Sequence, residues 1–300
     1  ENLESPKKAG FDDRIVEYEK IHQIKDEYFD KLVDAVDPRQ DEVILDGMDG
    51  YGSVAKHILK RAEEKNIYIE IFTVDESQVQ IDRARQNITD VDNEHLIQAD
   101  IRETGFSNEK FNTVVIKMGV HELPKEEQPK LFAEMHRLLK PGGKFVIWEL
   151  ALNEDNQTIF QDFIRKKDEL AGFTELVKNR YFPKHDELQT LFTQAGFEKI
   201  EDYFEMEYQP STLGRVGELV SKDRKQLLAQ QGYLSSADEE QLKNLGEERV
   251  KIWNEYIRNR IPEETREKIG YQDSGENIQI KVKKIIMVGH KKDEQFDASS

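Results

Sequence analysis

The sequence contains no cysteine among its 300 residues. Disulfide bonds, thiolate nucleophiles and cysteine-ligated zinc are therefore excluded, and we expect a reducing, cytoplasmic setting. No run of about 18 apolar residues occurs, so we expect no transmembrane helix. The first 40 residues also lack the apolar segment of a signal peptide.

The sequence is also short of positive charge. It has 44 Lys and Arg against 61 Asp and Glu, which gives a net charge of −17. Such a surface repels nucleic-acid phosphates and anionic membranes, so we expect neither as a partner. The 7 histidines show no metal-ligand spacing, so we expect no metal site.

What the sequence does contain is a regular alternation of apolar, strand-like runs with amphipathic, helix-like runs. This alternation is typical of βαβ units around a parallel sheet. The run at 112–118 is apolar at its centre, Val114-Val-Ile116, as expected of a central strand that is buried on both faces. The predicted strands of this series are Val43–Asp46, Ile67–Asp75, His95–Asp100, Asn112–Met118 and Lys144–Leu150.

The alternation breaks down after residue 150. Two further strands are predicted at 199–208 and 278–289, with helical segments before and between them. We expect four parts: a helical cap at 1–37, the sheet domain at 38–290 with helical insertions at 151–182 and 210–276, and a disordered tail at 291–300.

A glycine-rich turn follows the first strand. Asp46 closes that strand, glycines stand at 47, 50 and 52, and Ser53 lies near the start of a helix. Glycines in such a turn let a nucleotide-like ligand approach the backbone closely. Gly50-x-Gly52-x-x-Ala55 also satisfies a loose form of the dinucleotide fingerprint. The alternative is a tight strand-to-helix turn that binds no ligand.

Two more acids end neighbouring strands. Asp75 closes the second strand and Asp100 the third. Ligands of open α/β sheets bind at the carboxyl ends of the strands, so Asp46, Asp75 and Asp100 are predicted to converge on one crevice.

Four motifs, in order, resemble those of the class I S-adenosylmethionine-dependent methyltransferases, of the type typified by ubiquinone and menaquinone biosynthesis. They are Leu45-Asp-Gly-Met-Asp-Gly-Tyr-Gly52, Val74-Asp-Glu-Ser77, Gln98-Ala-Asp-Ile101 and Leu138-Leu-Lys-Pro-Gly-Gly-Lys-Phe-Val-Ile147. The resemblance covers about residues 37–208, with 278–289 as the last strand. It implies a Rossmann-like, seven-stranded, mostly parallel sheet with an antiparallel last strand, S-adenosylmethionine as cofactor and a small-molecule acceptor.

The resemblance also implies a role for each motif residue. Asp46 and the backbones of Gly47 and Gly50 would hold the methionine part of the cofactor, and Gly52 would permit close helix packing. Asp75, with Glu76 beside it, would bind the ribose hydroxyls, Asp100 and Ile101 would flank the adenine, and the backbone of Lys117 and Met118 would line the methionyl end. One position departs from the family, because Met48 stands where the family usually has glycine.

His121, just beyond the fourth strand, is the candidate catalytic base. A neutral imidazole near physiological pH can take a proton from the acceptor as the methyl group arrives. The alternative is that His121 only shapes its loop.

Two rival functions remain open at this point. A nicotinamide-dependent oxidoreductase would share the glycine turn and Asp75. Alternatively, Met48 could mark a catalytically degenerate chain that keeps the fold as a binding module. The insertion at 210–276 is interpreted as a lid over the acceptor, a homodimer contact or both, and its many charges leave a solvated helix pair as the alternative.

Overall fold

The computed structural model describes residues 26–50, 52–88, 94–171, 178–212, 247–275 and 278–293. The expectations for residues 1–25, for the insertion between 213 and 246 and for the tail from 294 onward lie outside the described residues. The chain divides into two compact units. The sheet unit takes in the described parts of 25–151, 185–206 and 284–300, and the helical unit those of 152–184 and 207–283.

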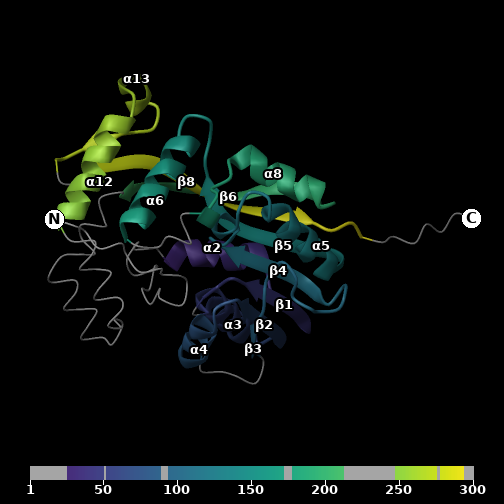
Figure 1. The fold of residues 1–300 in the computed structure, drawn as a ribbon. Helices are drawn as coiled ribbons and strands as arrows, with labels where there is room; N and C mark the ends of the chain where they lie inside the picture. Colours follow the sequence, from purple (N-terminus) through teal and green to yellow (C-terminus); the bar gives the residue numbers. More distant parts are fainter. Residues whose placement is uncertain are drawn as a thin grey trace, which may run out of the picture. The chain divides into compact units, whose positions relative to one another are not determined.

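The sheet unit follows the alternation of strands and helices predicted from the sequence (Figure 1). Its elements, in chain order, are α2 (Asp26–Val36), β1 (Glu42–Gly47), α3 (Ser53–Lys65), β2 (Ile69–Asp75), α4 (Gln78–Asn87), β3 (Glu94–Gln98), β4 (Phe111–Lys117), the 3-10 helix η2 (Val120–Glu122), α5 (Gln128–Leu138), β5 (Leu139–Ala151), α8 (His185–Gln194), β6 (Glu198–Thr212, through residue 206) and β8 (Ile278–His290, from residue 284).

The strands lie in the order β3-β2-β1-β4-β5-β8-β6. Strands β1 to β5 pair in parallel, as helical crossovers require. The sheet is mostly parallel with antiparallel last strands, which confirms the predicted Rossmann-like architecture. A short additional strand, β7 (Gln272–Asp273), pairs antiparallel with β8 inside a segment that was expected to be helical.

The register brings the carboxyl ends of the inner strands together. Asp46, near the end of β1, pairs with Thr73 of β2 on one side and with Val115 of β4 on the other. The turns that follow β1, β2 and β4 therefore share one edge of the sheet, which is where open α/β sheets bind ligands.

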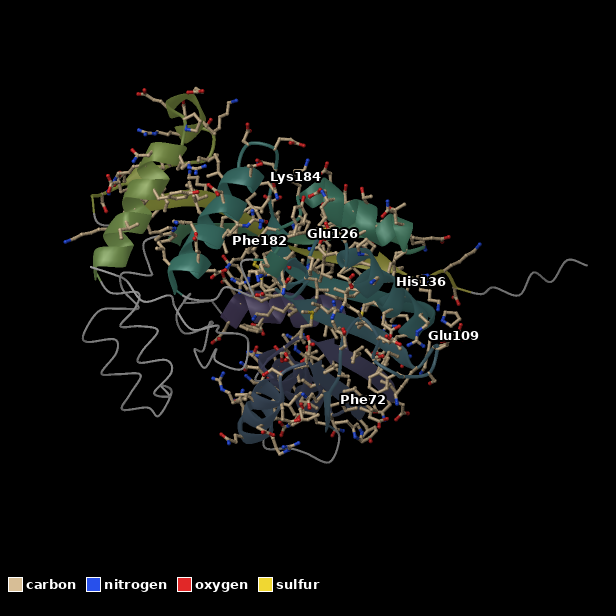
Figure 2. All side chains as sticks on the ribbon, in the orientation of Figure 1. Phe72, Glu109, Glu126, His136, Phe182 and Lys184 are labelled. Carbon is tan, nitrogen blue, oxygen red and sulfur yellow. The ribbon has the colours of Figure 1, made fainter. Side chains whose placement is uncertain are left out.

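The core of the sheet unit is built on β4. Its Val114, Val115 and Ile116 are fully buried, which explains the apolar centre of this run in the sequence. Phe72 of β2, labelled in Figure 2, extends this core toward the edge of the sheet by stacking on His95 at 4.4 Å between ring centroids.

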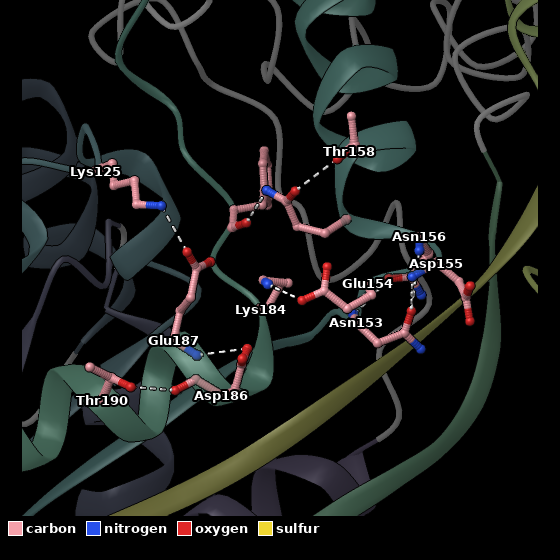
Figure 3. Close-up of polar contacts among 12 residues, drawn as sticks. Lys125, Asn153, Glu154, Asp155, Asn156, Thr158, Lys184, Asp186, Glu187 and Thr190 are labelled. Carbon is pink, nitrogen blue, oxygen red and sulfur yellow. Dashed lines mark hydrogen bonds and ion pairs between the residues drawn. The ribbon is translucent and has the colours of Figure 1, made fainter.

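Polar contacts hold the segment between β4 and α5. The side chain of Gln128 is buried and donates to the carbonyls of Val120 and Leu123, both at 3.1 Å. The ammonium of Lys125 lies 2.8 Å from the carboxylate of Glu187 in α8 (Figure 3). The loop that follows β4 is thus tied to two helices of its own unit. Helix α5 begins at Gln128 and has Pro129 in its first turn.

The helical unit contains α6 (Gln157–Ala171), α12 (Glu247–Arg260) and α13 (Glu263–Arg266). The indole of Trp253 donates to the carbonyl of Phe163 at 3.2 Å, and Asp168 pairs with Arg180 at 2.7 Å in a buried position. Asn153 and Asn156 bond to each other's backbone ahead of α6 (Figure 3). Among the described helices, none has the length and apolar character needed to cross a membrane.

Candidate cofactor and active site

The glycine turn after β1 is closed by a side chain that the sequence did not single out. The carboxylate of Asp49 accepts hydrogen bonds from the backbone N–H of Val54 at 2.8 Å and from the hydroxyl of Ser53 at 3.1 Å. Gly52 is the N-cap of α3, in a left-handed conformation with φ of 83°. Asp49 therefore caps the N–H groups at the start of α3. The sequence had suggested Ser53 for this capping role.

Asp46 lies directly beneath this turn and is fully buried. One carboxyl oxygen, Oδ2, accepts from the backbone N–H of Ala55 at 3.0 Å. The other oxygen, Oδ1, is buried and has no hydrogen-bond partner among the described residues. Burial, followed by the nearby charge of Asp49, raises the pKa of Asp46 well above its usual range. A buried oxygen of this kind is ready to accept a hydrogen bond from a ligand N–H.

Asp75, at the end of β2, holds the turn from the other side. Its two oxygens accept from the backbone N–H groups of Gly50 at 3.1 Å and Ser77 at 2.9 Å. Burial raises its pKa to about 6, against the lowering effect of these two hydrogen bonds. The adjacent Glu76 is exposed. The acid of β2 thus braces the glycine turn, and its role toward ribose hydroxyls stays a prediction.

The glycines of the turn serve two different purposes. Gly50 and Gly52 have positive φ values of 63° and 83°, which only glycine adopts freely. Gly47 is required by space instead, because a Cβ there would lie 2.8 Å from Cδ1 of the buried Ile101. At Gly52 a Cβ would lie 2.5 Å from Cδ1 of Ile88, directly after α4. The close packing predicted at Gly52 is therefore present.

Met48 occupies the turn in a left-handed conformation, with φ of 59°. Its backbone N–H donates to the carbonyl of Val74 at 2.8 Å. A Cβ on Gly119, in the turn after β4, would lie 3.0 Å from the sulfur of Met48. The Met48 side chain therefore lies against the turn after β4, between two of the loops that were predicted to bind the cofactor.

Asp100 follows β3 but is already engaged. Its carboxylate forms a two-pronged ion pair with Arg102, with nitrogen–oxygen distances of 2.7 Å and 2.8 Å, and this contact lowers its pKa. Arg102 also reaches Glu127 at 3.3 Å. The expectation that Asp100 flanks an adenine did not include this arginine, which follows it by only two residues.

Lys117, at the end of β4, lies in an aromatic environment. Its ammonium is 5.3 Å from the ring centroid of Phe29 in α2 and 5.5 Å from that of Trp148 in β5. The backbone N–H of Met118 donates to the carbonyl of Trp148 at 2.7 Å, with a φ of 53° at Met118. Both residues therefore lie at the predicted edge of the sheet.

His121 lies in η2, immediately beyond β4, and is buried. Its Nδ1 is 2.6 Å from the carboxylate of Glu149 in β5, and its Nε2 is 3.4 Å from that of Glu122. Burial alone would lower the pKa of His121, but the two carboxylates outweigh it and raise the pKa to about 9. This differs from the neutral base expected from the sequence, because an imidazole with this pKa is protonated at pH 7.

Comparison with known proteins identifies the domain. Residues 44–143 match a family of methyltransferase domains. Among curated relatives, the ubiquinone/menaquinone biosynthesis C-methyltransferase UbiE of Rickettsia prowazekii is 26% identical over 198 residues, which make up 60% of this chain and 76% of the relative.

Solved structures show the same fold. A Bacillus halodurans protein described as a methyltransferase superposes with a TM-score of 0.64 at 17% identity, covering 88% of this chain and 98% of that chain. Phosphoethanolamine N-methyltransferase 2 of Haemonchus contortus, in complex with phosphomonomethylethanolamine and S-adenosylhomocysteine, superposes with a TM-score of 0.52 at 17% identity, covering 94% and 57%. The domain match favours methyl transfer over the nicotinamide-dependent alternative.

Proposed function

Because this chain is a class I S-adenosylmethionine-dependent methyltransferase, we propose that it transfers the cofactor's methyl group to a carbon atom of a small-molecule acceptor. When bound, S-adenosylmethionine supplies a methyl group on a positively charged sulfur, which is already strongly electrophilic. The protein then has to align the acceptor with that methyl group, exclude water and remove a proton.

The observation that carries the cofactor assignment is the glycine turn with Asp46 beneath it. The buried Oδ1 of Asp46 has no hydrogen-bond partner among the described residues, and the turn beside it carries glycines at 47, 50 and 52. A cofactor amine fits this arrangement, because it would donate to that oxygen and favour its ionised form. Asp75 and Glu76 would bind the ribose hydroxyls, Ile101 would pack against the adenine and the backbone at 117–118 would line the methionyl end.

Carbon is proposed as the acceptor atom because the UbiE relative is named a C-methyltransferase. A carbon acceptor loses a proton when it gains a methyl group, so the reaction needs a proton acceptor close to the transferred group. Because His121 is protonated at pH 7, it is not available as that acceptor by itself, and its place beside Glu122 and Glu149 makes it a group that orients the neighbouring carboxylates.

The second candidate is a binding module of the same fold without turnover. Met48 favours it, since its side chain lies against Gly119 between two of the cofactor loops. The two candidates differ in one measurable property, which is whether the protein consumes bound S-adenosylmethionine in the presence of an acceptor.

Isothermal titration calorimetry with S-adenosylmethionine and with S-adenosylhomocysteine tests the cofactor site. We expect micromolar binding by the natural protein and at least tenfold weaker binding by Asp75→Ala, because Asp75 braces Gly50. Asp82→Ala removes a carboxylate from the exposed face of α4 and serves as the matched control, with unchanged affinity.

The possible outcomes distinguish the two candidate functions. Absence of binding to the natural protein would overturn the proposed function. Binding followed by methyl transfer to a quinol-type carbon acceptor, detected as S-adenosylhomocysteine release, would support it. Binding without turnover across a broad set of acceptors would favour the binding module.

A further inference from the structure

Arg102 links the loop after β3 to the start of α5. Its guanidinium lies beside the carboxylate of Asp100, with Nε 2.8 Å from Oδ1 and Nη2 2.7 Å from Oδ2. On its other side, Nη1 is 3.3 Å from the carboxylate of Glu127, the N-cap residue of α5. Glu127 in turn accepts from the ammonium of Lys130 at 2.8 Å. The guanidinium is therefore held from two sides, and its orientation fixes that of Asp100.

The carboxylate of Asp100 has one acceptor position left among the described contacts. Each carboxylate oxygen can accept about two hydrogen bonds. Oδ1 accepts from both Nε and the backbone N–H of Arg102, the latter at 2.9 Å. Oδ2 accepts from Nη2, and Nε lies farther from it, at 3.2 Å. Because the side chain of Asp100 is 38% exposed, a donor from outside the chain can reach the carboxylate.

Asp100 lies at the edge of the sheet that is proposed to bind the cofactor. On one side of it, the backbone N–H of Ala99 donates to the carbonyl of Asp75 at 3.1 Å. On the other side, Cδ1 of Ile101 lies so close to the glycine turn that a Cβ on Gly47 would be 2.8 Å from it. The two chain neighbours of Asp100 therefore contact the two segments that the proposed function assigns to S-adenosylmethionine.

The order of the strands brings the base of the cofactor to Asp100. Strand β2 lies between β1 and β3, and both pairs are parallel. With one end of the cofactor at the glycine turn after β1 and its ribose at Asp75 after β2, the base reaches the loop after β3. Besides the contact with Asp100, which has the largest effect, the charge of Glu76 raises the pKa of Arg102. Since Glu76 follows Asp75 directly, the guanidinium lies within electrostatic reach of the ribose end.

A fixed carboxylate with one open acceptor position discriminates between purine bases. The amino group at position 6 of adenine is a hydrogen-bond donor and satisfies that acceptor. A 6-oxo base presents a carbonyl oxygen at the same place, and the carboxylate repels it. A carboxylate that is free to rotate can turn away from this oxygen at little cost, whereas one held by a guanidinium fork cannot.

We propose that Arg102 is a positioning residue for the base of S-adenosylmethionine: it fixes Asp100 with one acceptor position toward the amino group of adenine, and so sets the preference of the site for a 6-amino over a 6-oxo purine. The proposal rests on the proposed function, since it takes the cofactor to lie at this edge of the sheet. Only binding is involved, so no covalent bond forms or breaks. The competing explanation is an ordinary surface ion pair that stabilises the loop.

Calorimetric titration with S-adenosylhomocysteine and with S-inosylhomocysteine, which carries the 6-oxo base, measures this preference. We expect the natural protein to bind S-adenosylhomocysteine about thirtyfold more tightly, as a hydrogen bond to a charged group allows. Arg102→Lys keeps the positive charge but loses the fork, so the preference should fall to about fivefold, mainly through weaker binding of S-adenosylhomocysteine. Arg85→Lys, in the exposed ion pair with Asp82 on α4, is the matched control and should leave both affinities unchanged.

The results that would overturn the positioning role are specific. One is a preference that stays near its natural value in Arg102→Lys. Another is an equal loss of affinity for both compounds, which is what an ion pair that only stabilises the loop produces. Equal binding of the two compounds by the natural protein would overturn the proposal and leave the methyltransferase assignment intact. Failure of the natural protein to bind either compound would instead overturn the proposed function.

The second test changes the acceptor itself. Asp100→Asn keeps one oxygen for the two hydrogen bonds at Oδ1 and replaces the other oxygen by an amide nitrogen, which donates. We expect S-inosylhomocysteine to bind about threefold to tenfold more tightly than it binds the natural protein, and S-adenosylhomocysteine more weakly, so that the preference disappears. A disturbed loop cannot produce a gain in affinity, so weaker binding of both compounds would contradict the proposal.

Discussion

Met48 adopts a backbone conformation that costs a non-glycine residue about 1 kcal/mol. Its φ is 59°, and its side chain lies against Gly119. We expect Met48→Gly to tighten S-adenosylmethionine binding by about threefold to tenfold, because the change relieves the strain and opens the space between the two loops. The free energy of unfolding should change by less than about 1 kcal/mol, since the lost side-chain packing offsets the gain in backbone freedom.

The matched control is Asn66→Gly at the end of α3, where φ is 52°. It relieves a similar conformation at a helix C-cap without touching the glycine turn, so calorimetry should show unchanged affinity. Weaker cofactor binding by Met48→Gly would mean that the methionine side chain contacts the cofactor instead of crowding it.

Glu94, at the start of β3, is a buried acid that neither the sequence analysis nor the proposed function uses. Its Oε1 accepts from the hydroxyl of Thr73 at 3.1 Å, and its Oε2 is buried without a partner among the described residues. Burial, which outweighs the Thr73 hydrogen bond, raises its pKa to about 7, and the charge of Asp49 adds to the effect. Ionised Glu94 therefore destabilises the folded state.

We expect Glu94→Gln to raise the free energy of unfolding by roughly 2 kcal/mol at pH 8, because glutamine keeps the Thr73 contact without the charge. At pH 5 the gain should nearly vanish, since Glu94 is then protonated in the folded protein. Thermal melts at the two pH values measure this, with the exposed Glu64→Gln of α3 as control. An equal gain at both pH values would rule out ionisation as the cause.

At the scale of elements, Gly52 lies where the start of α3 packs against the end of α4. It is the N-cap of α3, and a Cβ there would meet Cδ1 of Ile88 at 2.5 Å, where α4 ends. Gly105 has a similar φ of 78° but nothing within 4 Å of its Cβ position. Alanine variants at the two positions can therefore distinguish the conformational cost of an alanine from its steric cost.

We expect Gly105→Ala to lower the free energy of unfolding by about 1 kcal/mol, the cost of a left-handed alanine. Gly52→Ala should lower it by about 3 kcal/mol, since overpacking against Ile88 adds to the same conformational cost. Urea denaturation of both variants gives the comparison. Equal losses would mean that α4 moves aside at little cost.

The elements of the sheet unit could be predicted because each follows a local pattern. Strand β4 has Val114, Val115 and Ile116 at its centre, and α4 has the N-cap Ser77, whose hydroxyl accepts from the N–H of Gln80 at 3.3 Å. The two-residue β7 escaped prediction because it exists only through its pairing with β8.

The candidate site was predictable in position but not in chemical state. Asp46 and Asp75 were found because strand ends and glycine turns are visible in sequence. The charge of His121 was not, because it depends on Glu149, a residue 28 positions away that only the β4–β5 pairing brings within 2.6 Å. The pairing of Asp100 with Arg102 was missed because it depends on side-chain direction rather than on spacing.

At the scale of the whole molecule, the buried titratable groups all shift the pH dependence of stability in the same direction. The pKa of Asp75 is raised to about 6, that of Glu94 to about 7 and that of His121 to about 9, and that of Asp46 is also raised. Each raised pKa means that the folded state holds a proton more firmly than the unfolded chain does. Its contribution to stability is complete below the unfolded pKa and is lost as the pH rises through the folded value.

The exposed ion pairs shift the pH dependence of stability in the opposite direction. The pKa of Asp100 and that of Asp273 are lowered by arginine partners, so their contribution is present at neutral pH and disappears only in acid. These carboxylates are partly exposed and their pairs are screened, so their contribution is small. The net charge of −17 reinforces the effect of the buried groups, because protonation near pH 5 relieves repulsion between surface acids.

We therefore expect the sheet unit to be most stable between about pH 4 and 5 and to lose roughly 3 kcal/mol of unfolding free energy by pH 8.5. Hydrogen exchange of the β1 and β4 amides measures this unit alone, after correction for the intrinsic pH dependence of exchange. Because the pKa of His121 is raised to about 9 by its carboxylate neighbours, Glu149→Gln should flatten the curve above pH 8 and leave its acid limb unchanged. A stability that rises steadily from pH 5.5 to 8.5 would show that the surface ion pairs dominate over the buried groups.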